Sequence, residues 1–183
     1  MRNLVVSGYY GSKNAGDEAM LAAMLEVLSD LDPKLHITVI SASPADTSER
    51  HGVESISWLG FPSIIKALWH ADLLISGGGS LLQNVTSRRS LYYYLAIIFL
   101  AVVMRKKVML YAQGIGPIIG GLAEFAMRVI SNRVDLITVR DKGFALASYI
   151  YGEGVKPVSI NFQTYANRQT GQGMVPAADL MKM

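Results

Sequence analysis

Short apolar runs rich in β-branched residues alternate along this chain with longer stretches in which apolar residues recur at helical spacing. The short runs predict strands at residues 3–7, 36–41, 72–76, 107–112, 135–139 and 155–160. The longer stretches predict helices at residues 15–31, 63–70, 91–104, 122–131 and 143–151. Residues 43–60 are polar and follow neither period, so they are predicted to be irregular.

The alternation of strands with helices favours an α/β fold. Strands joined through helices form right-handed crossovers, which build a parallel sheet with helices on both faces. The strands are almost continuously apolar, as strands buried on both faces are. The sequence therefore predicts one Rossmann-like domain over residues 1–160. Residues 161–183 keep neither period and are predicted to form an irregular, poorly ordered tail.

The chain is apolar for a domain of this class, which bears on its partners. Hydrophobic residues make up 51% of its 183 residues and charged residues 17%, with a mean hydropathy of +0.30. Part of the apolar surface is expected to need a partner, a further domain or a membrane face. The apolar segment 91–104 is shorter than the roughly 20 residues that span a bilayer. It is predicted to be a buried core helix, and a helix lying on the membrane surface is the alternative.

Charge and composition exclude several kinds of chemistry. The net charge of +3 is too small to indicate nucleic-acid binding, although it suits a small anionic substrate in a cleft where cations converge. The absence of cysteine excludes disulfides, thiolate metal sites and a cysteine nucleophile. The three histidines lack metal-binding spacing, so no metal site is predicted. The first residues do not have the pattern of a signal peptide, and we expect a cytoplasmic protein, with the inner face of the membrane as an alternative location.

Small and polar residues gather where four of the predicted strands end, which is where open α/β sheets bind ligands. The candidates for binding a substrate through such loops are Gly11, Ser12, Asn14, Gly16, Gly77, Gly78, Gly79, Gln83, Gln113, Gly114 and Gly116. Asp17 follows the first loop and Arg140 ends the fifth predicted strand, where a guanidinium can bind a carboxylate or phosphate. In the alternative interpretation, the glycine-containing loops are ordinary turns, and Asp17 is an acid in the first turn of a helix that interacts favourably with the helix dipole. Neither G-x-G-x-x-G nor a Walker P-loop is present.

Four segments together resemble the polysaccharide pyruvyl transferase family, CsaB-like. They are GYYGSKNAGDEAML after the first predicted strand, GGGSLLQ after the third, AQGIGP after the fourth and ITVRD at the fifth. The resemblance covers residues 1 to about 158 and implies the N-terminal half of a GT-B fold. It also implies transfer of pyruvate from phosphoenolpyruvate to a cell-wall polysaccharide sugar such as N-acetylmannosamine, on a lipid-linked or polymeric acceptor. In such proteins the product is a ketal that anchors surface-layer proteins.

The resemblance also implies roles for individual residues. Arg140 would bind one anionic group of phosphoenolpyruvate, the loop from Gly11 to Gly16 would bind the other, and Asp17 would act as acid or base. No cofactor is implied beyond phosphoenolpyruvate as the donor substrate. Family members are about twice as long, so a C-terminal GT-B half is expected to be missing from these 183 residues, and a homo-oligomer or a separate half is a candidate partner. Two alternatives stay open: a GT-B glycosyltransferase that uses a nucleotide sugar, and a truncated, non-catalytic anion-binding domain.

Overall fold

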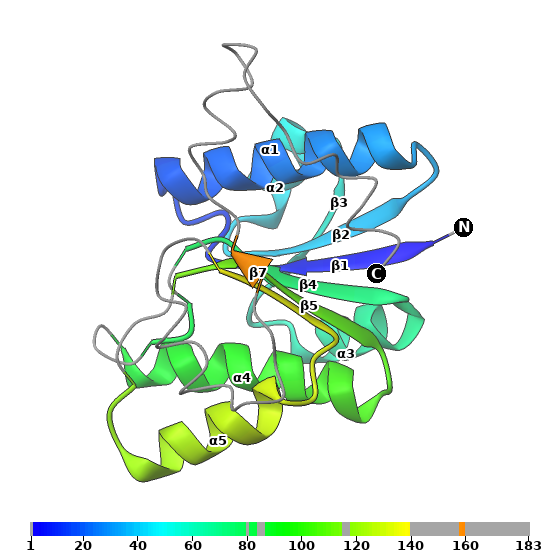
Figure 1. Ribbon diagram of the computed structural model, residues 1–183. Helices are drawn as coiled ribbons and strands as arrows, with labels where there is room; N and C mark the ends of the chain where they lie inside the picture. The colour runs from blue at the N-terminus through cyan, green and yellow to red at the C-terminus, as the bar shows by residue number, and fades with distance from the viewer. Residues whose placement is uncertain (1, 80, 84–86, 115–117, 140–157, 160–183) are drawn as a thin grey trace.

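A single parallel sheet forms the centre of the chain. The computed structural model describes residues 2–79, 81–83, 87–114, 118–139 and 158–159. Within them the strands are β1 (Asn3–Ser7), β2 (His36–Ser41), β3 (Glu54–Ser57), β4 (Leu73–Gly77), β5 (Lys107–Gln113), β6 (Leu136–Val139) and β7 (Val158–Ser159). All neighbouring pairs are parallel, in the order β3-β2-β1-β4-β5-β6-β7. The predicted Rossmann-like α/β fold is confirmed (Figure 1).

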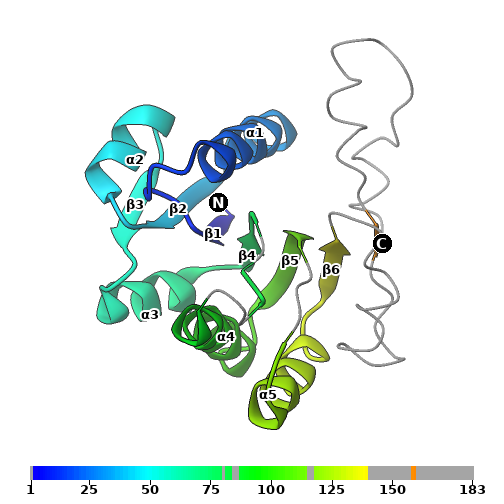
Figure 2. The same cartoon turned by 90° about the vertical axis from the view of Figure 1, so that its left-hand side faces the viewer.

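Helices cover both faces of this sheet. On one face lie α1 (Ala15–Leu31) and α2 (Pro44–His51). On the other lie α3 (Phe61–His70), α4 (Arg88–Val103) and α5 (Gly121–Ser131), side by side in one layer (Figure 2). The molecule therefore has three layers, helix, sheet and helix, over the described residues.

Alternate side chains of each strand enter two separate cores. In β1, Leu4 and Val6 pack with residues of α1 such as Leu21, whereas Val5 packs with residues of α3 and α4. This alternation follows from the two-residue period of a strand. It explains why the strands read as continuous apolar runs, since both of their faces are buried.

Residues 43–60 were predicted to be irregular, and that prediction is wrong. They contain α2 and the strand β3. Pro44 occupies the start of α2, where its missing N–H costs nothing, but Thr47 is the helix's one buried residue, so apolar periodicity is absent. β3 pairs with β2 at the edge of the described sheet, and it alternates serine with apolar or charged residues rather than forming an apolar run.

The apolar segment 91–104 belongs to α4, which is buried on one side only. Leu91, Leu95 and Ile98 are buried against the sheet, as predicted, but Phe99 and Val103 are exposed. Among the described residues no helix is both long and apolar enough to cross a membrane. The predicted helix at 143–151 and the predicted tail at 161–183 lie outside the described residues.

Candidate functional site

The candidate site lies at the carboxyl ends of the central strands. From β1 the chain first builds β2 and β3 on one side, and it then returns to place β4, β5 and β6 on the other side. The loops after β1 and β4 therefore leave in opposite directions, and the edge of the sheet at such a switch point is where ligands bind in open α/β sheets. The loop at residues 8–14, the loop that begins at Gly77 and the end of β5 meet at this edge.

Tyr10 fills the point where the ends of β1 and β4 come together. Its ring is buried, and its hydroxyl donates a hydrogen bond of 2.7 Å to the carbonyl oxygen of Gly77. Only glycine fits beside it, because a β-carbon on Gly78 would lie 2.8 Å from the Tyr10 hydroxyl oxygen. Burial, with a smaller contribution from the negative charge of Asp17, raises the pKa of Tyr10 well above its usual value. The phenol therefore stays protonated and holds the glycine loop by a permanent hydrogen bond.

Asp17 lies against the glycine loop of β4. It is 9% exposed in the first turn of α1, and a β-carbon on Gly79 would lie 2.9 Å from its Oδ1 atom. Gly79 itself has a φ of +79°, which favours glycine. The amide of Gly114 donates a hydrogen bond of 3.1 Å to the carbonyl oxygen of Gly79. Loops from three strands are therefore joined around the Asp17 carboxyl group.

A bulge in β5 sets the direction of Gln113. Leu110 pairs with Ile137 and Gln113 pairs with Val139, so β5 has one residue more than β6 over this stretch. The extra residue is accommodated at Ala112, whose φ of +48° is rare for a residue with a β-carbon. Gln113 is fully buried, and its Nε2 donates a hydrogen bond of 2.9 Å to the carbonyl oxygen of Ser76.

Three buried polar atoms at this edge have no hydrogen-bond partner among the described residues. They are the Oε1 atom of Gln113 and the hydroxyl oxygens of Ser7 and Ser76. Ser7 and Ser76 are register partners on β1 and β4, so they share one face of the sheet. Unsatisfied buried polar atoms are rare and call for an explanation. Here they indicate a polar site below the loops.

Thr138 stabilises the bulge, and this gives a first prediction. Its hydroxyl oxygen accepts a 2.7 Å hydrogen bond from the amide of Ala112, which the ladder leaves unpaired. Thr138→Val keeps the shape but leaves that buried N–H unsatisfied, so we expect the free energy of unfolding to fall by about 1–3 kcal/mol. Chemical denaturation of both proteins measures the difference. Thr138→Ser retains the hydroxyl and serves as the control, and an equal loss in that variant would refute the role of the hydroxyl.

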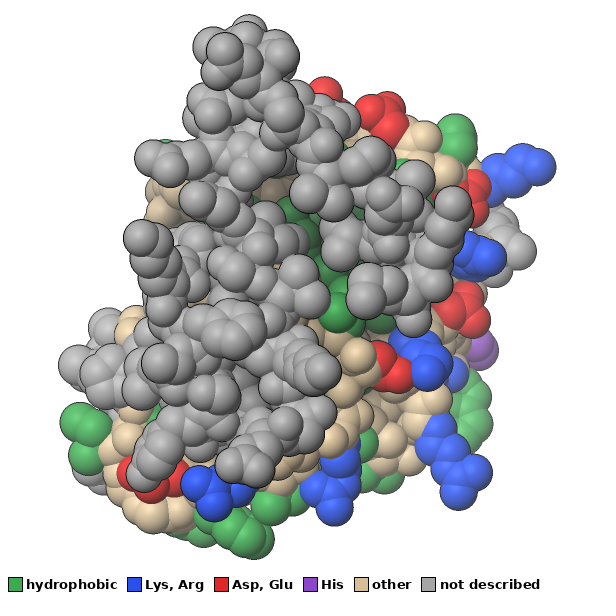
Figure 3. Space-filling model, in the orientation of Figure 1, with side chains coloured by type: hydrophobic (Ala, Val, Ile, Leu, Met, Phe, Trp, Pro, Cys, Tyr) green, Lys and Arg blue, Asp and Glu red, His purple; other side chains and the backbone are tan. Residues whose placement is uncertain are grey.

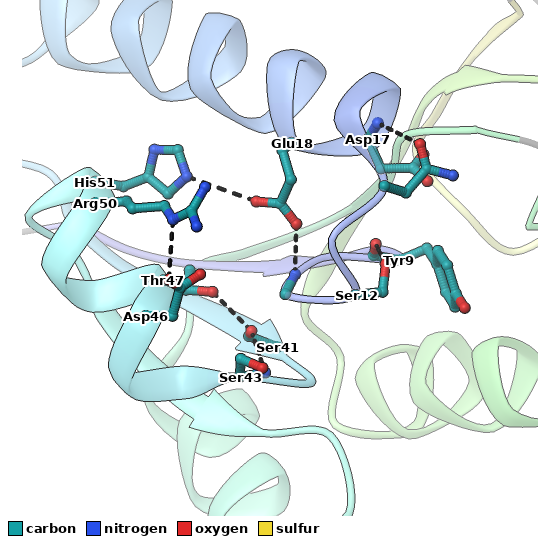
Figure 4. Close-up of polar contacts among 12 residues, drawn as sticks. Tyr9, Ser12, Asp17, Glu18, Ser41, Ser43, Asp46, Thr47, Arg50 and His51 are labelled. Atoms are coloured by element: carbon teal, nitrogen blue, oxygen red, sulfur yellow. Dashed lines mark hydrogen bonds and ion pairs between the residues drawn. The ribbon is translucent and has the colours of Figure 1, made fainter.

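The loop between β1 and α1 uses most of its polar groups internally (Figure 4). The amide of Gly11 donates a 2.7 Å hydrogen bond to Oε1 of Glu18, and the Ser12 hydroxyl donates to the carbonyl oxygen of Tyr9. Asn14 caps α1, because its Oδ1 accepts from the amides of Gly16 and Asp17.

Glu18 also connects the loop to α2. Its Oε2 lies 3.8 Å from Nε2 of His51, and both side chains are largely buried. Glu18 thus ties both the loop and α2 to α1, and its side chain points toward His51 (Figure 4). Its role is positional, which agrees with the structural interpretation of Glu18 and has no bearing on Asp17.

Comparison with known proteins decides the family. A family model described as polysaccharide pyruvyl transferase matches residues 14–156, well over half of the chain. The chain belongs to the polysaccharide pyruvyl transferase family. No curated protein matches it. The family resemblance predicted from the four segments is therefore confirmed.

The structure brings together only part of the set of residues predicted for a pyruvyl transferase site. Asp17 meets the loop Gly77–Gly79, and Gln113 and Gly114 join them. Gln83 is partly buried in the segment after that loop. The residues of the first loop, Gly11, Ser12, Asn14 and Gly16, lie beside Asp17 but donate or accept the internal hydrogen bonds described above. Arg140 and Gly116 lie outside the described residues.

Two tyrosines that sequence reasoning did not single out belong to this site. Tyr10 is one, and Tyr94 of α4 is the other. Burial raises the pKa of Tyr94, with smaller contributions from Tyr93 and from the charge of Asp17. The sequence carries a weak signal for both, since each lies in a run of tyrosines, but a run does not reveal which member is buried.

A metal centre has no support in the part of the chain that the structure describes. Among those residues no group of three or more histidines and carboxylates is arranged to hold a metal ion. The described residues at this edge thus offer one buried carboxyl group, two protonated phenols, an amide side chain, the hydroxyls of Ser7 and Ser76 and backbone amides.

Proposed function

We propose that this chain binds phosphoenolpyruvate and transfers its pyruvyl group to a sugar of a cell-wall polysaccharide, such as N-acetylmannosamine, to form a cyclic ketal. The family match over residues 14–156 carries the proposal. The edge of the sheet at the ends of β1, β4 and β5 is the proposed site, because a buried carboxyl group meets three glycine-containing loops there. A cytoplasmic location, where phosphoenolpyruvate is made, is part of the proposal.

The reaction defines what such a site has to supply. The methylene carbon of phosphoenolpyruvate gains a proton, two sugar hydroxyls add to its second carbon, and phosphate leaves. Of the two hydroxyl protons, one restores the acid that protonated the methylene carbon, and the other departs with phosphate. The site therefore needs an acid and base near the second carbon, and donors that stabilise its oxocarbenium-like character and the leaving phosphate.

Asp17 is the proposed acid and base in this half of the site. It is nearly buried, it lies beside Gly79, and Tyr10 and Tyr94 are close enough for its charge to raise their pKa values. The flexible glycines Gly78 and Gly79 let a substrate approach the backbone closely. In the first loop, the backbone amides of Gly11 and Gly16 already donate hydrogen bonds to Glu18 and Asn14. The proposal therefore assigns the binding of the donor's phosphate and carboxylate mainly to Arg140.

Titration with phosphoenolpyruvate tests the proposal, and Arg140 provides its sharpest variant. We expect the purified chain to bind phosphoenolpyruvate by isothermal titration calorimetry. Arg140→Ala should weaken binding by about tenfold or more, because a bidentate charged contact is lost. Arg133→Ala is the matched control, since Arg133 lies at the opposite end of β6 and is exposed, and it should bind as the unchanged chain does.

Three results would contradict the proposal. A folded chain that binds a nucleotide sugar but not phosphoenolpyruvate would favour a GT-B glycosyltransferase. A chain that binds inorganic phosphate as tightly as phosphoenolpyruvate would favour a non-catalytic anion-binding domain. Equal binding by the chain and by Arg140→Ala would remove Arg140 from the donor site.

A further inference from the structure

The outer surface of the layer formed by α3, α4 and α5 is apolar where a solvent-facing layer would be polar. In α4 the residues at the outward positions are Tyr92, Ala96, Phe99 and Val103. They recur at helical spacing and form one continuous stripe. A helix that packs on a sheet ordinarily carries charged or polar residues on that side, and this stripe has no charge.

The neighbouring helices repeat the pattern. Phe61, Ile65 and Trp69 form an exposed stripe on α3, and Trp69 is 65% exposed. Leu122 and Phe125 of α5 are 73% and 64% exposed. Because the three helices lie side by side on one face of the sheet, their stripes form one broad surface, which we call the α3–α5 surface (Figure 2). An apolar surface of this breadth indicates an interaction site.

The charged side chains around the α3–α5 surface are mostly basic. The described exposed cations on the three helices are Lys66, Arg89 and Arg128, and the loops after the helices add the cations Arg105, Lys106 and Arg133 and the carboxylates Asp72 and Asp135. The carboxylate on these three helices is Glu124. Figure 3 shows the edge of the layer along its lower rim, where hydrophobic and basic side chains gather.

The opposite layer has the opposite charge. α1 carries Asp17, Glu18, Glu26 and Asp30 and has no basic residue. An anionic surface would therefore attract the α3–α5 surface and repel the α1 layer, which fixes the orientation of the domain.

We propose that the α3–α5 surface binds the surface of an anionic lipid bilayer. Apolar and aromatic side chains that project from convex helices enter the boundary between headgroups and acyl chains, while lysine and arginine pair with lipid phosphates. A protein partner would fit less well, because charged residues are depleted at the centre of protein interfaces, whereas Lys66 lies within this surface, next to Ile65 on α3. Trp69 and Lys106 illustrate the combination: Nζ of Lys106 donates a 2.7 Å hydrogen bond to the backbone carbonyl oxygen of Trp69, a residue whose side chain is exposed.

The surface also leaves the candidate site free. The candidate site is at the carboxyl ends of the strands, whereas the α3–α5 surface is the outside of a helix layer. A domain bound in this way keeps the edge with Asp17 and Gly79 open, next to the bilayer. The proposal rests on exposure and charge and does not depend on the transferase activity.

Co-sedimentation with lipid vesicles tests it. We expect the chain to pellet with vesicles of phosphatidylcholine and phosphatidylglycerol, to stay in solution with phosphatidylcholine alone, and to bind more weakly as salt is raised. The double variant Phe99→Ser and Phe125→Ser should bind at least about tenfold more weakly, because two apolar side chains no longer enter the bilayer. The double variant Lys66→Glu and Arg128→Glu should lose about tenfold or more through charge. All four side chains are exposed, so the melting curves of both double variants, measured by circular dichroism, should match that of the unchanged chain.

Matched variants of the opposite layer serve as controls. Leu31 is an exposed apolar residue of α1, and Lys34 is an exposed cation that follows it. Leu31→Ser and Lys34→Glu should bind vesicles as the unchanged chain does. The proposal would be overturned if the folded chain does not bind anionic vesicles, or if it binds neutral vesicles equally well. It would also be overturned if the control substitutions weaken vesicle binding as much as the substitutions in the α3–α5 surface do. It would also fail if Phe99→Ser and Phe125→Ser only dissociate a dimer in sedimentation velocity, because the surface would then join two copies of the chain.

Discussion

Asp17→Asn is expected to lower the turnover of pyruvyl transfer by about a hundredfold or more, which is the usual effect of losing a general acid or base. Asparagine has nearly the same shape, so the contact with Gly79 and the first turn of α1 should remain. It cannot exchange a proton with the substrate, however. Turnover is measured as phosphate release from phosphoenolpyruvate in the presence of an acceptor sugar.

Two comparisons separate catalysis from structure in this prediction. Asp30→Asn changes an exposed carboxylate of the same helix and should leave turnover unaltered. Asp17→Asn should still bind phosphoenolpyruvate, because the variant keeps the loops in place. Unchanged turnover in Asp17→Asn would remove Asp17 from the acid–base role, and lost binding with a lower melting temperature would make it a structural residue.

The fold could be predicted from the sequence because most strands are buried on both faces. β1, β2 and β4 each appear as an apolar run, and the helices between them show apolar residues at helical spacing. The prediction failed at α2 and β3, where burial is slight. Hydrophobic patterning records burial, so an element that buries one threonine leaves little trace of itself.

Part of the candidate site could be predicted for a topological reason. Parallel strands present their carboxyl ends at one edge, so Asp17, Gly79 and Gln113 had to lie near one another once their strands were identified. The partners of each group could not be predicted. Asn14 was predicted to bind substrate, yet its side chain caps α1. The cap uses the Oδ1 acceptor of Asn14, whereas binding an anion would use its Nδ2 donor, so the cap fixes the position of the side chain and leaves the donor available.

Local conformation was the least predictable feature. Tyr9 and Tyr10 are adjacent and chemically alike, but Tyr9 is half exposed whereas Tyr10 is buried beneath the glycine loop. Nothing in the sequence indicates the positive φ of Ala112, since alanine is not a residue that marks a bulge. The amide of Ala112 donates to the hydroxyl of Thr138, which lies on a different strand and 26 residues away in sequence.

Gly79→Ala is expected to lower turnover by about a hundredfold while it reduces stability only modestly. The new β-carbon would lie 2.9 Å from Oδ1 of Asp17, so the carboxyl group has to move. A carboxyl group at the end of a short side chain moves at small cost in stability. A displacement of about 1 Å is nevertheless enough to lower a rate by about a hundredfold when the group takes part in the reaction. The positive φ adds roughly 1–2 kcal/mol of backbone strain.

Gly52→Ala is the control that isolates the effect of the contact between the new β-carbon at position 79 and Oδ1 of Asp17. Gly52 has a φ of +65°, close to that of Gly79, but nothing lies within 4 Å of the β-carbon it would gain. Both variants therefore carry similar backbone strain, and only Gly79→Ala displaces Asp17. Chemical denaturation should show similar losses of stability in the two, whereas phosphate release should fall only in Gly79→Ala. Equal turnover in both variants would mean that the position of the Asp17 carboxyl group does not matter to the reaction, and it would contradict the catalytic role on which the first prediction rests.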